Sequence, residues 1–108
     1  MRRALKIGTP LVYGTDAIDA QEGSETRGTI AMSGIEPWIE AGVPARVLLK
    51  SMTGDAARLL GVEKQRGLLR IGLAADIIAT PENPMETPLT LKRVSFVMKD
   101  GVVFKKVE

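Results

Sequence analysis

Six residues near the start of the chain, Leu11-Val12-Tyr13-Gly14-Thr15-Asp16, constrain its fold more than any other stretch. Apolar residues in direct succession, without polar alternation, predict a strand that is buried on both faces, as in a parallel sheet. Parallel sheets carry their chemistry at the carboxyl ends of their strands. Asp16 follows the strand at that end, so it is a candidate site residue. A single aspartate after a strand is also a common turn former or helix cap, and both interpretations stay open here.

The sequence contains no histidine and no cysteine. Histidine is the commonest metal ligand and the usual general base near neutral pH. Without it, the chain does not hold a complete zinc hydrolase site or a Ser-His-Asp triad. The absence of cysteine excludes disulfides, thiolate metal sites and cysteine nucleophiles.

Composition excludes further classes of protein. A chain of 108 residues, 44% of them hydrophobic, predicts about one globular domain. A net charge of +2 and an aromatic content of 4% give no basis for nucleic-acid binding. No apolar run is long enough to span a membrane, and the N-terminus lacks the apolar region of a secretory signal. We therefore expect a soluble cytoplasmic protein with neither nucleic-acid nor membrane partners.

The first thirty residues predict a short helix and a loop around the Leu11–Asp16 strand. Met1–Lys6 resembles the last turns of a helix, because its basic residues suit the negative end of the helix dipole and Gly8 can end it. The helix is so short that the chain is expected to begin part-way through an element. Ala17–Ile30 is polar and without periodicity, which predicts a surface loop.

Three short helices are expected next. The first begins either at Ser33, which has capping-box spacing to Glu36, or at Pro37 as the first helical residue. The second begins at Pro44, and the third begins at a Thr53 cap with Asp55 in its first turn. Gly42 and Gly61 end the first and the third helix. The expected core-facing residues are Ile35, Trp38 and Ile39; Val47, Leu48 and Met52; and Ala56, Ala57 and Leu60.

From Val62 onward the pattern favours strands. Gly67–Gly72 predicts a short strand or turn, Ala75–Thr80 a strand, and Pro81–Pro84 a loop. Asp100-Gly101 stands between two β-rich runs, 94–99 and 102–105, and predicts a hairpin with a two-residue type I′ turn.

The chain resembles the C-terminal part of the metal-dependent amidohydrolase superfamily, in its imidazolonepropionase-like and prolidase-like branch. The order and spacing of several short motifs carry the resemblance. These motifs are Gly8, Gly14-Thr15-Asp16, Ala41-Gly42, Thr53-Gly54-Asp55-Ala56-Ala57, Leu59-Leu60-Gly61, Gly67, Gly72, Ala75-Asp76, Asn83-Pro84 and Val97-Met98-Lys99-Asp100-Gly101.

The resemblance implies an α/β fold that is only part of a larger one. Family members are (β/α)8 barrels joined to a small β-sandwich. Residues 1–61 would supply the last barrel strand and the helices after it, and residues 62–108 the C-terminal strands of the sandwich. A barrel needs about 250 residues, so it would be incomplete here. Asp16 matches the family's aspartate on the eighth strand, a metal ligand that also takes the proton from the attacking water. Asp76 matches a structural position of the sandwich.

The chain departs from the family in its metal ligands. The family binds a divalent metal, zinc, with histidines that this sequence lacks. A catalytic zinc site generally needs three protein ligands, so no cofactor is expected in the isolated chain.

Three interpretations of function follow from this departure. The chain is a piece of an amidohydrolase without activity of its own, which we favour; or it is one half of a split hydrolase completed by a partner chain; or it is a relic reused as an oligomerisation or binding module. An uncovered Leu11–Asp16 strand would pair with another chain, so a homo-oligomer or a partner chain on this strand is expected.

Overall fold

The computed structural model describes residues 1–16 and 26–107, which form helices in the first half of the chain and a small antiparallel sheet in the second. The helices are α1 (Arg2–Lys6), α2 (Arg27–Ser33), α3 (Ile35–Glu40), α4 (Ala45–Met52), α5 (Gly54–Leu59) and the 3₁₀ helix η1 (Pro88–Arg93). The strands are β1 (Ile77–Ala79), β2 (Phe96–Lys99) and β3 (Val102–Lys106), in the order β1-β2-β3. This mixed α/β arrangement agrees with the predicted α/β class, and the assignment to the end of a barrel and part of a sandwich stays a prediction.

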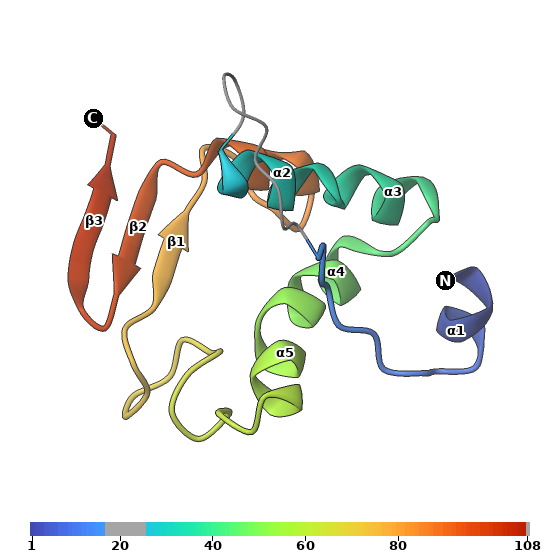
Figure 1. The fold of residues 1–108 in the computed structure, drawn as a ribbon, viewed down its shortest axis with the longest axis horizontal. Coiled ribbons are helices and arrows are strands. Elements are labelled where there is room, and N and C mark those ends of the chain that lie inside the picture. Colours follow the sequence, from blue (N-terminus) through green and yellow to red (C-terminus); the bar gives the residue numbers. More distant parts are fainter. Residues whose placement is uncertain (17–25, 108) are drawn as a thin grey trace.

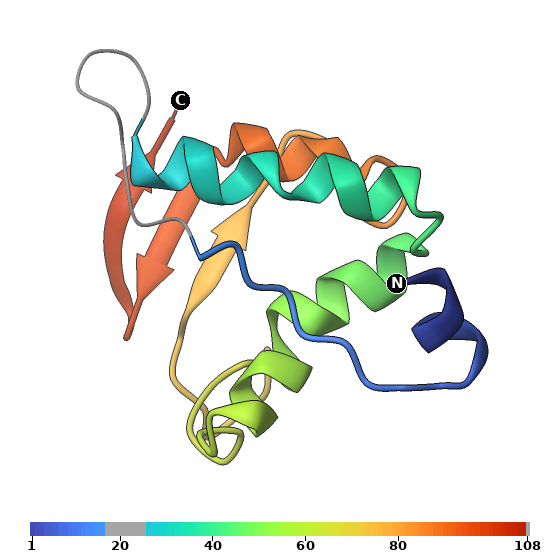
Figure 2. The ribbon, with the colours of Figure 1, turned by 45° about the vertical axis from the view of Figure 1, so that its right-hand side comes forward.

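The helices and the sheet occupy different sides of the molecule (Figure 1). Helices α2 and α3 follow one another almost end to end, and η1 lies beside them (Figure 2). Helices α4 and α5 lie below this pair, and α1 lies on the side away from the sheet (Figures 1 and 2). Among the described residues, no helix has both the length and the apolar character that crossing a bilayer requires.

The core lies where α3, α4 and η1 meet. Ile35 and Trp38 project from α3, Leu48 from α4 and Leu91 from η1, and all four are buried. Three of them were predicted to face a core from their helical spacing, and that prediction is confirmed. Leu91 was not, because η1 has too few residues for a periodic pattern to show.

The predicted strand at Leu11–Tyr13 is absent from the structure. This stretch has no regular secondary structure, although its side chains are half-buried against the helical core. Its backbone bonds to the helices through Tyr13, whose N–H donates to the carbonyl of Ser51 at 3.2 Å. A strand needs a ladder of such bonds to a neighbouring strand, and none of the described strands lies beside this segment. The prediction was therefore wrong for this chain.

Two predicted features of the first helical region were also wrong. Helix α2 begins at Arg27, inside the expected loop, because Thr26 and Thr29 cap it reciprocally. Residues 17–25 of that loop lie outside the described part of the chain. Ser33 caps no helix, because it ends α2 and its hydroxyl donates to the carbonyl of Ile30. This capping box was not predicted, because its third helical residue is Thr29, where Glu or Gln is usual.

The start of α5 and the face that it buries differ in part from the prediction. Thr53 stands at the N-cap position, but its hydroxyl donates backward to the carbonyl of Leu49 at 2.8 Å. Ala57 is buried as expected, whereas Leu60 is 73% exposed, because the helix already ends at Leu59. Gly61 follows with a φ of 70°, as a helix-ending glycine should.

The hairpin is confirmed in detail. Asp100 and Gly101 have φ angles of 49° and 80°, the two positive values that a type I′ turn requires. Strands β2 and β3 flank this turn, and β1 pairs with β2 through Ile78 opposite Val97. The first strand is shorter than predicted, and residues 67–72 form turns rather than a strand.

We predict that Leu48→Ala lowers the free energy of unfolding by about 2–5 kcal/mol, because it empties a fully buried position. Leu59→Ala is the matched control on α5, where the side chain is 71% exposed, and it should change stability by less than about 0.5 kcal/mol. Chemical denaturation followed by circular dichroism measures both. Equal effects of the two substitutions would show that the core does not lie between α3 and α4.

Candidate functional site

Asp16 stands at the end of the extended segment that crosses the helices. Its side chain is exposed, and its backbone has a φ of 49°, in the left-handed region that aspartate tolerates better than most residues. Asp100 has the same φ for a purely structural reason, the type I′ turn. The backbone angle of Asp16 is therefore no sign of catalysis by itself. The Asp16 carboxylate has no hydrogen-bond or ion-pair partner among the described residues, and it shares this with Glu40 and Glu63; its place at the end of the segment fixed by Tyr13 is what sets it apart.

Tyr13 fixes the segment that leads into Asp16. Its hydroxyl donates to the carbonyl of Ala31 in α2 at 2.6 Å, and its ring centroid lies 5.4 Å from that of Trp38 in α3. Burial raises the pKa of the Tyr13 phenol, so the hydroxyl stays protonated and remains a donor. A Cβ on Gly34 would come within 2.5 Å of this hydroxyl, and only glycine fits there. The contact holds the segment across the junction between α2 and α3.

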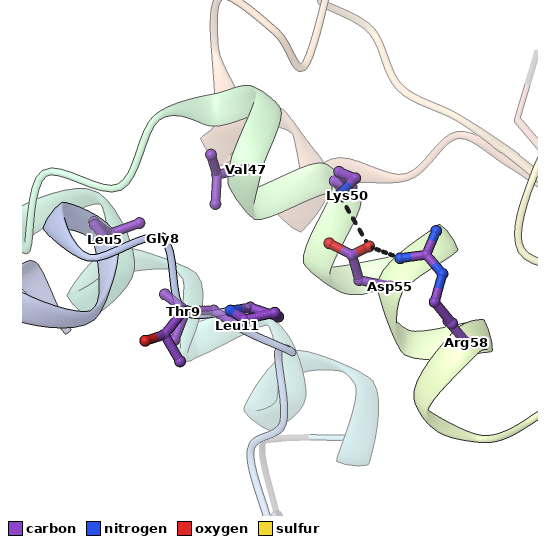
Figure 3. A pocket seen from close by; sticks show the side chains of 9 residues that line it. Leu5, Gly8, Thr9, Leu11, Val47, Lys50, Asp55 and Arg58 are labelled. Carbon is purple, nitrogen blue, oxygen red and sulfur yellow. Dashed lines mark hydrogen bonds and ion pairs between the residues drawn. The ribbon is translucent and has the colours of Figure 1, made fainter.

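A small pocket of about 290 Å³ lies farther back along the same segment, between Leu11 and helices α4 and α5 (Figure 3). At its edge Asp55 accepts hydrogen bonds from Lys50 at 3.0 Å and from Arg58 at 2.7 Å. The hydrogen bond from Lys50, reinforced by Arg58, holds the pKa of Asp55 below its usual value. Lys50 and Arg58 both pair with the Asp55 carboxylate, so the three side chains together carry one positive charge. They lie at the edge of a pocket whose lining is mostly apolar. Asp16 is not among the residues that line this pocket.

Asp76 has a structural environment, as the family resemblance implied. Its carboxylate accepts hydrogen bonds from the backbone N–H of Asp100 at 2.9 Å and from Arg66 at 3.1 Å. Arg66 also pairs with the Asp100 carboxylate at 3.2 Å. The bond from the Asp100 N–H, with Lys99 and Arg66 nearby, holds the pKa of Asp76 below its usual value. Asp76 thereby ties the start of β1 to the hairpin turn.

The residues that the structure describes do not fit a divalent metal by themselves. No three acidic, histidine or cysteine side chains come together among them, and the whole sequence has neither histidine nor cysteine. One carboxylate falls short of the three protein ligands of a catalytic zinc. Asp16 is thus a single potential ligand.

Comparison with known proteins decides the family. The model of the amidohydrolase family matches residues 1–104. The chain belongs to the amidohydrolase family. A comparison of this amidohydrolase chain with curated proteins gives no match.

Solved structures share the fold of this amidohydrolase chain. A Xaa-Pro dipeptidase with methionine bound in its active site is 33% identical, with a TM-score of 0.81 over 96% of this chain and 24% of its own. Molinate hydrolase is 21% identical, with a TM-score of 0.76 over 95% of this chain and 25% of its own. A protein of Bifidobacterium longum described as a prolidase is 22% identical, with a TM-score of 0.75 over 99% and 26%. The chain spans about a quarter of the length of these proteins.

Sequence reasoning missed the ion-pair clusters of this amidohydrolase chain. Asp55 was expected only as an acidic residue in the first turn of a helix, and the i,i+3 spacing to Arg58 was the signal for their pairing. The pairing of Lys50 with Asp55 depends on the angle between α4 and α5, which no local pattern shows. Arg66 reaches two aspartates that lie 10 and 34 residues away, and no local pattern predicts this either.

We predict that Asp76→Asn destabilises the amidohydrolase chain, whereas Asp16→Asn is neutral or stabilising. The first substitution weakens two charge-assisted hydrogen bonds, and the second removes a charge from an exposed carboxylate without a described partner. Asp16→Asn should change the free energy of unfolding by less than about 0.5 kcal/mol in urea denaturation. The reverse order would show that Asp16 is an ordinary capping or turn residue.

The pH dependence of stability should also show the contribution of Asp76. Because the folded-state pKa of Asp76 is lowered, its carboxylate stabilises the fold above the unfolded-state pKa of about 3.9. That contribution is lost as the pH falls through the lowered value. The fall in stability between pH 7 and pH 3 should therefore be smaller in Asp76→Asn than in the unsubstituted chain.

Proposed function

We propose that this chain is the C-terminal part of a metal-dependent amidohydrolase that hydrolyses C–N bonds, and that it has no activity by itself. Its contribution to the active site is Asp16, in the role that the family resemblance gives it: a metal ligand and the acceptor of the proton from the attacking water. The remaining ligands come from outside these 108 residues. The observation that carries the proposal is a family match over residues 1–104 in a sequence without a single histidine.

The position of Asp16 supports this role. Hydrogen bonds lower the pKa values of three carboxylates: that of Asp55 chiefly through Lys50, that of Asp76 chiefly through the backbone N–H of Asp100, and that of Glu82 chiefly through the Thr90 hydroxyl. They hold helices, turns and loops together. Asp16 instead ends a segment that Tyr13 fixes to the helices, and its carboxylate is exposed. An immobilised segment that ends in an uncommitted carboxylate suits a ligand that completes a site built with other residues.

The proposed substrate class is a dipeptide with proline in the second position. It rests on the Xaa-Pro dipeptidase, which is 33% identical to this chain. The two less similar structures are 21% and 22% identical and support the fold alone. Cyclic amides, which the resemblance to the imidazolonepropionase-like and prolidase-like branch also implies as substrates of the parent family, are the alternative.

Two other functions remain as alternatives. In a split hydrolase, a separate partner chain would bring the histidines and cover the Leu11–Asp16 segment. As an oligomerisation or binding module, the chain would assemble with itself and need no metal. Hydrolysis that appears only when a partner chain is added favours the first, and a stable self-assembly in the absence of metal favours the second.

We predict that the purified chain hydrolyses no Xaa-Pro dipeptide with added zinc, because one carboxylate does not make a catalytic metal site. The positive arm of the experiment is a graft, in which residues 1–108 replace the matching quarter of the Xaa-Pro dipeptidase. The graft should hydrolyse Xaa-Pro dipeptides, and Asp16→Asn in the graft should lower kcat by about 10²–10⁴-fold.

Asp100→Asn is the matched control, since Asp100 has the same φ as Asp16 and asparagine also suits its turn. It should leave kcat of the graft unchanged within about twofold. A folded graft in which Asp16→Asn retains full activity contradicts the proposed role. Zinc-dependent turnover by the purified chain that disappears in its own Asp16→Asn variant would instead contradict the proposal that the chain has no activity by itself.

A further inference from the structure

Gly34 is the residue between α2 and α3, which follow one another almost end to end (Figure 2). We infer that Gly34 is a positioning residue for Asp16. Because it has no side chain, Tyr13 and Thr15 can pack against the junction of the two helices, and this contact fixes the direction in which Asp16 projects. The inference rests on the proposed function of Asp16 and adds a residue that acts on the same site from a distance.

The backbone of Gly34 does not require a glycine. Its φ of −65° and ψ of −11° are right-handed helical values, which all L-residues adopt. In a helical backbone glycine is less favourable than every residue except proline, because it loses the most conformational entropy on folding. Alanine would suit these backbone angles better. What requires a glycine at this position is therefore the space beside it.

That space holds the segment that leads to Asp16. A Cβ on Gly34 would lie 2.5 Å from the Tyr13 hydroxyl oxygen and 3.3 Å from the ring carbon that carries this oxygen. It would also lie 3.1 Å from the methyl carbon of Thr15, the residue directly before Asp16. The Tyr13 hydroxyl is held in place by its 2.6 Å hydrogen bond to the carbonyl of Ala31. Two residues of the segment therefore depend on the absence of a side chain at position 34.

The contact at Gly34 determines which way the end of the segment faces. Tyr13 and Thr15 are half-buried, whereas Gly14 and Asp16, which alternate with them, are exposed. A period of two is that of an extended chain, whose successive residues point to opposite sides. Packing of the two half-buried residues on the helices thus directs the two exposed residues away from the helices. A shift of Tyr13 and Thr15 off the junction would carry the Asp16 carboxylate with it.

The size of that shift is large for a catalytic site. With a Cβ at position 34, the Tyr13 oxygen would have to move from 2.5 Å to the 3.4 Å at which ordinary contact begins, which is about 0.9 Å. Site residues must be held within about 0.5 Å of their productive positions. A misplacement of about 1 Å can cost about 10²-fold in rate. A single methyl group on Gly34 should therefore impair the proposed role of Asp16 without touching Asp16 itself.

A spin label in the chain alone tests the geometry. The chain has no cysteine, so Gly14→Cys provides a unique labelling site, and a Cβ there meets nothing within 4 Å. The line shape of the label in electron paramagnetic resonance measures how firmly the segment is held. We expect Gly34→Ala to narrow the line shape, because the label moves faster. Gly28→Ala in α2 is the matched control and should leave the line shape unchanged, since its Cβ would meet only the Thr26 hydroxyl, at 3.7 Å.

Tyr13→Phe separates the local clash from a general loss of folding. It removes the oxygen that a Cβ at position 34 would strike, and the remaining contacts of 3.1 Å and 3.3 Å need shifts of only a few tenths of an ångström. The double variant Tyr13→Phe/Gly34→Ala should therefore hold the label more firmly than Gly34→Ala does, although it carries one more substitution.

Kinetics of the Xaa-Pro dipeptidase graft test the consequence for the reaction. Gly34→Ala in the graft should lower kcat at least tenfold and change KM less than threefold, because Asp16 is proposed to act on the attacking water and not to bind the substrate. Gly28→Ala should leave kcat unchanged within about twofold. Addition of Tyr13→Phe to Gly34→Ala should raise kcat at least threefold.

An unchanged line shape in Gly34→Ala overturns the inference, and so does an equal change in Gly28→Ala. If Gly34→Ala does not fold, the double variant should still fold, and its failure to fold overturns the inference too. In an active graft, a rise in KM without a fall in kcat contradicts the positioning role. An unsubstituted graft without activity, or one that keeps full activity with Asp16→Asn, counts against the proposed function. A mobile label in Gly34→Ala that Tyr13→Phe restrains upholds the contact in either case, so the two failures are distinguishable.

Discussion

The structure depends on the contact between Tyr13 and the junction of α2 with α3. The Leu11–Asp16 segment has no strand beside it among the described residues, so it takes its position from the helices. Tyr13 supplies that position through the bond to Ala31, the packing on Trp38 and the backbone bond to Ser51. The contact requires a glycine at position 34, because any side chain there would displace the Tyr13 hydroxyl. Contacts with the helices, in place of a neighbouring strand, thus hold this segment, and they fix the position of Asp16 at its end.

Two features of this chain bear on the proposed function. One is chemical, because Asp16 is a single potential metal ligand in a sequence without histidine. The other is physical, because Leu60, Leu69 and Ile78 are exposed around one groove. Membership of the amidohydrolase family and coverage of about a quarter of the solved structures link the two. We propose that polypeptide outside these 108 residues supplies the remaining ligands.

Much of the fold was predictable from local patterns, and the errors have physical causes. The type I′ hairpin was predicted correctly because Asp100-Gly101 defines both turn angles locally. The core residues Ile35 and Leu48 followed from helical spacing. The Leu11–Tyr13 strand was wrong because an apolar run shows that residues are buried, not what they pair with. The role of Asp16 came from the family resemblance and stays a prediction, since no local pattern separates a ligand from a turn residue. The division at residues 61 and 62 into a barrel part and a sandwich part also stays a prediction.

The central claim is that Asp16 is the metal ligand which this chain contributes to an amidohydrolase. The most direct measurement is a crystal structure of the graft grown with zinc, with anomalous diffraction recorded on both sides of the zinc absorption edge. We expect an anomalous peak at about 2.0–2.2 Å from a carboxylate oxygen of Asp16. An occupied zinc site elsewhere in the graft, with the Asp16 carboxylate beyond coordination distance, would contradict it.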